Sequence, residues 1–354
     1  MRKRASKATD DVAAQPRRLR KATMKDVANL AGVSLATVSR TLSAAAEVSP
    51  RLSRRVQAAA QSLDYAVNIN ARGLRGKTSG LVVVLLPDIA NPFFSVLLQG
   101  IEEQARSHEM AVLIGDTGVD RAIAETYWRL IEGQRADGMI LLNGFLPFPP
   151  GKRAVADYPI VVVSERIAGV DAPIVGIDNV AAGFDAVSYL ARLGHRRVAH
   201  ICGPADNVLT HERRSGYLKA VEAHDLERWP EAIQPGEFSI RAGRLATARL
   251  LAASPRPTAV FAANDEIAIG AIMEAKANGL RVPEDLSVVG FDDIEMSQIC
   301  DPPLTTIYQP RREMGRKALE TLARLVESPG RRPPDALLDH KLVVRDSATP
   351  PAPR

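Results

Sequence analysis

The side chains best suited to a specific chemistry lie in a short segment near the start of the chain. Ser34 can cap a helix that runs to Thr41 or Leu42, and Val38 faces inward on that helix. Arg40 can form two hydrogen bonds with the O6 and N7 atoms of a guanine. The exposed side of the helix carries Leu35, Ala36, Thr37, Ser39 and Arg40. The pattern therefore predicts a recognition helix for the major groove of DNA.

Residues for catalysis, metal binding or cofactor binding form no comparable pattern. Three histidines of the second half lack both the i, i+4 spacing and the nearby carboxylates of a metal site: His195, His200 and His211. The segment Gly73–Thr78 ends like a phosphate-binding loop, but no strand precedes it. We therefore expect no metal, no cofactor and no enzyme activity.

Three short helices must position the recognition helix. Thr23 is the expected N-cap of the first helix, and Gly32 supplies the turn before the second. The third is expected over Pro50 to about Leu63, with proline at its first position. These features predict a helix-turn-helix unit over residues 23–66. Residues 1–22 are basic, polar and without an apolar period, so we expect a disordered arm.

The charge of the chain is unevenly distributed. Residues 1–77 hold 16 of the 46 Lys and Arg and 5 of the 41 Asp and Glu, a net +11. The remaining 277 of the 354 residues therefore carry a net −6. A basic head on a mildly acidic body indicates a polyanionic partner for the head alone. The alternative is a solvated head whose charge only aids solubility.

Strand-length apolar segments alternate with helix-length segments after residue 80. The expected strands are Leu81–Pro87, Ala111–Asp116, Gly138–Asn143, Ile160–Ser164, Val175–Asp178, Val198–Gly203, Ala259–Asn264 and Ser287–Phe291. Their continuous apolar character suits parallel strands buried on both faces. The alternation predicts a doubly wound α/β body of two lobes over residues 80–345. The proline-rich residues 346–354 are expected to be a disordered tail.

Cysteine usage and the N-terminus indicate a compartment. Cys202 and Cys300 are the only cysteines, which fits a reducing environment. The charged start Met1–Arg4 is not followed by the apolar segment of a signal peptide. The apolar runs are also shorter than the ~20 residues of a membrane helix. We expect a cytoplasmic protein, associated with the nucleoid if it binds DNA.

Short motifs, in a fixed order over most of the chain, resemble the lactose-repressor (LacI/GalR) family of bacterial regulators. They include Thr23–Ala28, Gly32–Ser34, Thr37–Arg40, Asn91–Phe94, Gly194–Arg197, Asn264–Asp265, Val282–Asp292 and Pro303–Ile307. Phe184–Val187 and Cys300–Pro303 are most similar to its cytidine-repressor branch. The family implies a periplasmic-binding-protein-like body with a small effector in the cleft between its lobes. It also implies a lobe boundary near residue 179 and later crossovers near 310 and 335.

The resemblance further implies a hinge helix in the linker over residues 67–79, which would fold on meeting the operator. The family's DNA contacts would fall on Thr23 in the head and, in the hinge, on Asn68, Ala71, Arg72, Leu74 and Arg75. Leu74 matches the leucine that inserts into the minor groove and bends the DNA. Val67 stands where many members have proline, so we expect a hinge helix that is less preorganised and more costly to fold. A plain flexible linker is the alternative.

By the same resemblance, single residues of the body would bind the effector. Arg213 matches the family's effector-binding arginine and Asp292 its opposing carboxylate, a pair that fits vicinal hydroxyls. Phe238 matches the aromatic residue against the ligand ring. Weaker candidates around the crevice are Asp88, Phe93, Phe94, Ser164, Glu165, Asn264 and Gln309. The alternatives are core positions for the two phenylalanines and a solvated face for Arg213.

Together these features predict a homodimeric repressor, or a higher oligomer, that binds a pseudo-palindromic operator. A small effector, expected to be a nucleoside such as cytidine, would control the affinity for DNA. One alternative is a regulator of the same family that responds to a pentose, a sugar acid or another carbohydrate. The other is a solute-binding protein or sugar-processing enzyme that shares the α/β body.

Overall fold

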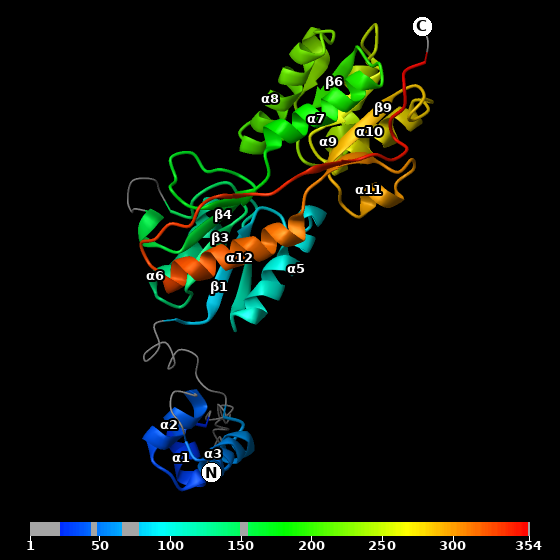
Figure 1. Cartoon of the computed structure of the whole chain (residues 1–354). Coiled ribbons are helices and arrows are strands. Elements are labelled where there is room, and N and C mark those ends of the chain that lie inside the picture. Colours follow the sequence, from blue (N-terminus) through cyan, green and yellow to red (C-terminus); the bar gives the residue numbers. More distant parts are fainter. Residues whose placement is uncertain (1–21, 44–47, 66–77, 149–154, 353–354) are drawn as a thin grey trace, which may run out of the picture. The chain divides into compact units, whose positions relative to one another are not determined.

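The computed structural model describes residues 22–43, 48–65, 78–148 and 155–352 (Figure 1). The chain divides into two compact units, a head over Met1–Lys77 and a body over Thr78–Arg354. None of the helices within the described residues is both long and apolar enough to cross a membrane.

The head is a bundle of three helices. They are α1 (Met24–Ala31), α2 (Leu35–Ser43) and α3 (Pro50–Ser62). Val27, Val38 and Val56, one from each helix, are fully buried and form the centre of a small apolar core. Gly32 ends α1 with φ 60°, a left-handed conformation that glycine adopts without strain. The three helices and the turn predicted from the sequence are therefore present.

The first lobe of the body is built on a parallel six-stranded sheet with the order β11-β5-β4-β3-β1-β2. Its strands are β1 (Leu81–Leu86), β2 (Ala111–Asp116), β3 (Gly138–Leu141), β4 (Ile160–Val163), β5 (Ile174–Gly176) and β11 (Ala336–Leu337). Its helices are α5 (Pro92–Ser107), α6 (Arg121–Glu132) and α12 (Arg311–Glu327), with a 3₁₀ turn at Val155–Asp157.

Both faces of this sheet are covered. Val82 and Val84 of β1 belong to the core that includes α5 and α12, whereas Val83 belongs to the core that includes α6. A Cβ atom on Gly100 of α5 would overlap the backbone of α12, so glycine is needed where these two helices meet.

The second lobe has a six-stranded sheet with the order β12-β10-β9-β8-β6-β7, in which only β12 is antiparallel to its neighbour. Its strands are β6 (Val198–Ile201), β7 (Ile233–Gln234), β8 (Ala259–Ala262), β9 (Ser287–Asp292), β10 (Thr305–Tyr308) and β12 (Lys341–Val343). Its helices are α7 (Asn179–Arg192), α8 (Val208–Ala223), α9 (Ile240–Leu251), α10 (Asp265–Ala277) and α11 (Met296–Ile299), with a 3₁₀ turn at Pro230–Ala232.

The chain passes between the two sheets three times: after β5, after β10 and between β11 and β12. The helical head and the doubly wound two-lobed body confirm the predicted fold class. All eight predicted strands are present, but β7, β10, β11 and β12 were not predicted. None of these four strands is a continuous run of large apolar residues.

The prediction of a disordered tail over residues 346–354 is wrong for residues 346–352. Ser347 is fully buried, and its hydroxyl donates to the Val288 carbonyl (2.6 Å) and accepts from the Thr305 N–H (2.8 Å). Thr349 donates its N–H to the Ser287 hydroxyl (3.0 Å). The proline-rich composition concealed a segment whose polar groups pair with the second sheet.

Candidate functional site

The first turn of the head is fixed by a capping box. The Thr23 hydroxyl accepts from the Asp26 N–H (3.3 Å), and the Asp26 carboxylate accepts from the Thr23 N–H (2.8 Å). The Ser34 hydroxyl likewise accepts from the Thr37 N–H (3.1 Å) at the start of α2. Arg55 of α3 donates to the Ala31 carbonyl (2.7 Å), which ties the third helix to the turn. These contacts set the orientation of α2 within the head.

The outer face of α2 matches the predicted recognition helix in all but one position. Leu35 is 49% exposed, Ala36 and Arg40 are exposed, and Thr37 is half-buried. Ser39 is only 9% exposed, so the prediction that it lies on the exposed face is wrong. Ser39 is next to the inward-facing Val38 on the helix, so the rest of the bundle covers it. The Arg40 side chain donates to the Ala36 carbonyl (3.4 Å).

The predicted hinge falls on residues outside the described part of the chain. Val67, together with the predicted DNA contacts Asn68, Ala71, Arg72, Leu74 and Arg75, lies within residues 66–77. The hinge helix therefore stays a prediction.

Arg213 of α8 is the centre of the candidate site in the body. It is only 3% exposed, which rules out the alternative that it lies on a solvated face. Its guanidinium donates to the Asn179 side-chain oxygen (3.1 Å) and to the Ala263 carbonyl (2.6 Å). Its Cζ atom lies 3.7 Å from the centroid of the Phe291 ring. The arginine is therefore held on several sides by the second lobe.

Asp292 ends β9 opposite this arginine. Its Oδ1 atom lies 3.7 Å from Arg213 Nη2 and accepts a hydrogen bond from Gln309 Nε2 (2.7 Å). Its backbone has φ 113°, a conformation that costs a non-glycine residue energy and often marks a functional position. Burial raises the pKa of Asp292 to about 6, although Arg213, Arg311 and Gln309 oppose the shift. The structure thus brings three predicted residues together.

Further carboxyl groups surround the same arginine. Burial raises the pKa of Glu165, and it also raises the pKa of Glu212. The pKa of Asp265 is raised well above its ordinary value by burial and by the negative charge of Asp292. Two buried guanidinium groups, those of Arg213 and Arg311, therefore face a larger number of acids, which favours an uncharged hydroxyl-bearing ligand over an anion.

Of the residues predicted on the first lobe, Ser164 and Glu165 follow β4. Ser164 has φ 67°, and its buried hydroxyl has no hydrogen-bond partner among the described residues. The Glu165 carboxylate lies against Gly144, whose φ of 69° is a left-handed conformation that glycine adopts without strain. Asp88 is exposed, and its carboxylate accepts from the Ala90 N–H (2.8 Å).

The two predicted phenylalanines lie at the start of α5. Phe93 and Phe94 are 7% and 8% exposed and belong to the apolar core that includes β1 and α12. Their rings meet edge to face at 5.2 Å. Phe93 also lies 6.0 Å from Arg311, measured from its ring centroid to the Cζ atom. Both are core residues, and Phe93 is close to the polar site.

Two predicted residues of the second lobe have different surroundings. The Asn264 side-chain oxygen caps α10 by accepting from the Ile267 N–H (2.9 Å). The side-chain nitrogen is left to donate to a ligand. Phe238 is half-buried, and its ring lies against Gly203, where a Cβ atom would overlap it. Its role against a ligand ring stays a prediction.

Sequence reasoning missed two polar residues of this region. Asn179, at the start of α7, holds Arg213 through its side-chain oxygen. Asn143 follows β3, is 5% exposed, and neither polar atom of its amide has a hydrogen-bond partner among the described residues. A polar residue at the end of a buried apolar run is a signal that could have identified Asn143.

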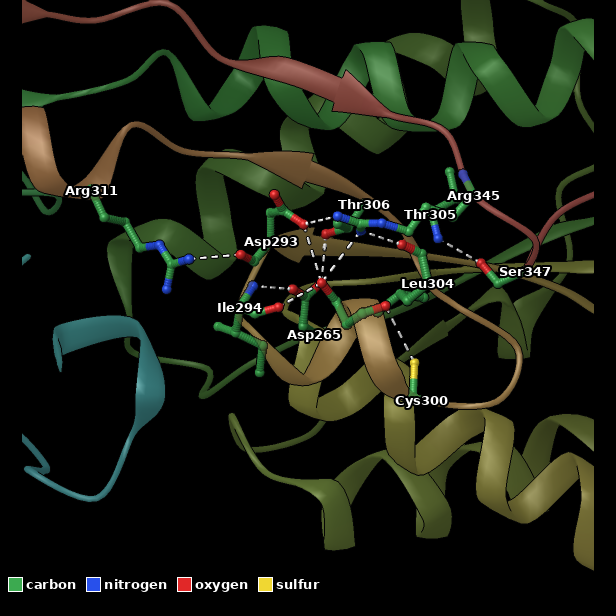
Figure 2. A network of polar contacts seen from close by, with 11 residues as sticks. Asp265, Asp293, Ile294, Cys300, Leu304, Thr305, Thr306, Arg311, Arg345 and Ser347 are labelled. Atoms are coloured by element: carbon green, nitrogen blue, oxygen red, sulfur yellow. Dashed lines mark hydrogen bonds and ion pairs between the residues drawn. The ribbon is translucent and has the colours of Figure 1, made fainter. Parts of the chain in front are cut away.

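A polar network supports the strand that carries Asp292 (Figure 2). The Asp293 carboxylate pairs with Arg345, the residue before the tail (2.6 Å), and the Asp293 carbonyl accepts from Arg311 of α12 (2.6 Å). The Asp265 carboxylate accepts from the Ile294 N–H (2.8 Å) and the Thr306 hydroxyl (2.5 Å). The network ties the end of β9 to α10, α12 and the tail. Among the described residues, no group of three His, Cys, Asp or Glu could hold a metal ion.

Two family models match the chain. Residues 23–68 match the bacterial regulatory proteins of the lacI family, and residues 187–348 match the periplasmic binding protein-like domain.

Full-length relatives agree with both family models. The HTH-type transcriptional repressor CytR of Escherichia coli K12 is 41% identical over 92% of this chain and 96% of its own. The ribose operon repressor of Haemophilus influenzae is 31% identical over 92% of this chain and 98% of its own. The structure of the lac repressor dimer bound to operator and the anti-inducer ONPF aligns with a TM-score of 0.81, at 29% identity over 93% of this chain and all of the other.

Proposed function

Because this chain belongs to the lacI family of bacterial regulatory proteins, we propose that it represses transcription from an operator and that a nucleoside such as cytidine controls its affinity for DNA. The family membership confirms the resemblance noted in the sequence. Its members are regulators, which also confirms the expectation that the chain is not an enzyme and sets aside the solute-binding alternative.

One observation carries the effector part of this proposal. A buried arginine, Arg213, lies 3.7 Å from the carboxylate of Asp292, and Gln309 donates to the same carboxylate. A guanidinium that donates beside a carboxylate that accepts fits the two vicinal hydroxyls of a ribose ring. The acids around Arg213 oppose a phosphate, which favours a nucleoside over a nucleotide. Phe238 would lie against the base.

The DNA-binding part rests on the head. The exposed Leu35, Ala36 and Arg40 of α2, with Thr37 beside them, would face the major groove. Thr23 at the N-terminus of α1 would contact a phosphate. Two heads of a homodimer would read the two halves of a pseudo-palindromic operator, and the hinge residues 67–79 would bend it. A protein that acts this way works in the cytoplasm, at the nucleoid.

A carbohydrate effector is the second candidate. The ribose operon repressor of Haemophilus influenzae is a relative over nearly the full length. The Arg213–Asp292 pair would also fit the vicinal hydroxyls of a free pentose, which lacks a base for Phe238 to contact. A sugar acid fits less well, because its carboxylate would meet the acids that surround Arg213.

Calorimetric titration of the full chain with cytidine, adenosine, ribose and gluconate separates these candidates. Saturable binding of a nucleoside, and release of bound operator DNA by the same nucleoside, supports the proposal. Binding of ribose or gluconate without binding of either nucleoside would replace it with the carbohydrate alternative.

Arg40→Ala tests the base-reading role of α2. Loss of contacts to a guanine should lower affinity for a selected operator by about 10–100-fold, with a smaller loss on non-specific DNA. Arg51→Ala, an exposed arginine on α3, is the matched control and should affect both DNAs alike. Equal losses on both DNAs for Arg40→Ala, measured by gel shift, would contradict base readout.

A further inference from the structure

A cavity beside α8 is separate from the residues of the candidate effector site. Its volume is about 460 Å³, within the range of small-molecule sites, and Arg213 is not among its lining residues. One wall is α8, through residues such as His211, Arg214 and Leu218, and the other is the segment 228–235. The residues that follow β6 also line it.

The lining of this cavity carries positive charge without a compensating acid. Arg214 and Arg228 line it together with His211, and no Asp or Glu is among the lining residues. Both arginines are exposed, and neither forms an ion pair with a carboxylate in the described parts of the chain. Glu227, next to Arg228 in the sequence, is already paired with Arg197 (3.1 Å). The two guanidinium groups are therefore available to an anion.

Two hydrogen-bond donors of the lining are buried and unpartnered. Thr210 is 4% exposed and its hydroxyl has no partner within the described residues. The indole N–H of Trp229 is buried and likewise lacks a partner there. The Trp229 ring is fixed by Arg197, whose Cζ atom lies 4.0 Å from the ring centroid. Buried donors without partners are uncommon in folded proteins and point to a ligand that accepts hydrogen bonds.

The rest of the lining is apolar. Tyr217, Val221, Ile233 and Pro235 contribute to it, and Leu218 remains 45% exposed on its rim. A ligand for this cavity needs an apolar part for these residues and an anionic group for the arginines.

We propose that this cavity is a second ligand site, which binds a small organic anion with an aromatic or other apolar part. Its carboxylate, phosphate or sulfonate group interacts with Arg214 and Arg228, and its apolar part packs beside Trp229. The chemistry is opposite to that of the effector site, where acids surround the arginine. Because Arg213 and Arg214 are adjacent on α8, each site contacts the same helix.

The two tryptophans of the chain allow a direct test. Trp128 packs against Phe148 and Tyr158 in the core of the first lobe, so Trp128→Phe keeps an aromatic ring there and leaves Trp229 as the only tryptophan. We expect phenyl phosphate to change the Trp229 fluorescence of this full-length variant in a saturable way. Phenol and inorganic phosphate, which each lack one half of the ligand, should bind at least about tenfold more weakly.

Substitutions at the exposed arginines complete the test. Arg214→Gln and Arg228→Gln, each made with Trp128→Phe, should weaken phenyl phosphate binding by about tenfold or more. Arg249→Gln, an exposed arginine of α9 outside the lining, is the matched control and should change nothing. Asp292→Asn should retain phenyl phosphate binding, and cytidine should not displace the probe. No saturable signal, equal affinity in the arginine variants, or displacement by cytidine would overturn the proposal.

Discussion

The two lobes present different chemistry where their strands end. In the second lobe the polar groups pair with one another: Arg213 with Asn179 and Asp292, and Asp292 with Gln309. In the first lobe the amide of Asn143 and the hydroxyl of Ser164 are buried without a partner among the described residues. The binding groups of the second lobe are thus already held by hydrogen bonds, whereas those of the first lobe lack partners that a ligand would supply.

This difference indicates an order of events for the effector. Side chains that are already held in place lose little conformational freedom on binding, so the effector should contact the second lobe first. Closure of the first lobe would then give partners to Asn143 and Ser164. Such a closure links the occupied cleft to the rest of the chain, and the linkage must be reciprocal: DNA should change effector affinity by the same factor.

The largest effect is expected from Asp292→Asn, which removes the negative charge of this side chain but keeps its shape. Loss of a charged hydrogen-bond acceptor for the ligand hydroxyls should weaken effector binding by about 10–100-fold. Binding to operator DNA in the absence of effector should persist, because Asp292 lies in the body. Calorimetry and a gel shift measure the two properties.

Asp225→Asn is the matched control for this substitution. Asp225 also pairs with an arginine, Arg196 (3.3 Å), but its side chain is fully exposed on the surface of the second lobe. Its amide variant should bind effector normally. An unchanged effector affinity in Asp292→Asn would remove this carboxylate from the site.

The buried tail provides the next prediction. Ser347→Ala leaves the Thr305 N–H and the Val288 carbonyl without their side-chain partner, so the free energy of unfolding should fall by about 1–3 kcal/mol. Ser107→Ala, which removes an exposed hydrogen bond on α5, should change it by less than about 0.5 kcal/mol. Denaturant unfolding measures both values. Equal stability of the two variants would show that the tail does not support the second lobe.

The sequence predicted the sheets better than it predicted the polar site. Continuous apolar runs such as Val82–Leu86 identify buried strands, because the signal is local. The burial of Ser347 depends instead on Val288, 59 residues away, and on Thr305, 42 residues away. Pairing over such distances leaves no local pattern.

The residues of the site divide in the same way. Arg213 and Asp292 could be assigned only through the family resemblance: Asp292 ends the motif Val282–Asp292, and Arg213 matches the family's effector-binding arginine. Asn143 and Asn179 are single polar residues, and only the packing of the strands and of α8 shows what they face. Ser39 has the residue type of a DNA contact, yet the packing of three helices buries it.

The pH dependence of effector binding should report the charge of Asp292 on the second lobe. The pKa of Asp292 is raised to about 6, so its carboxylate is ionised above that pH and protonated below it. If the ionised form accepts the ligand hydroxyls, affinity should fall by about tenfold from pH 7 to pH 5.

Other acids that face Arg213 also have raised pKa values, namely Glu165, Glu212 and Asp265. Asp292→Asn separates their contribution, because it should flatten most of the pH profile measured by calorimetry. An Asp292→Asn profile as steep as that of the unchanged chain would assign the dependence to these neighbouring acids.

The smallest effect on effector affinity is expected from Asn143→Leu in the first lobe. Leucine keeps the branched shape of asparagine but removes an amide that has no partner among the described residues. Effector affinity should fall by about 3–10-fold, the contribution of one ordinary hydrogen bond. The free protein should lose no stability, because no internal hydrogen bond is broken.

Thr247→Val is the matched control, since the Thr247 hydroxyl of α9 is also buried and unpartnered within the described residues. It should leave effector affinity unchanged. If Asn143→Leu instead destabilised the free protein and left effector affinity intact, the amide would have a structural role. The contrast between a preorganised second lobe and a first lobe completed by ligand would then rest on Ser164 alone.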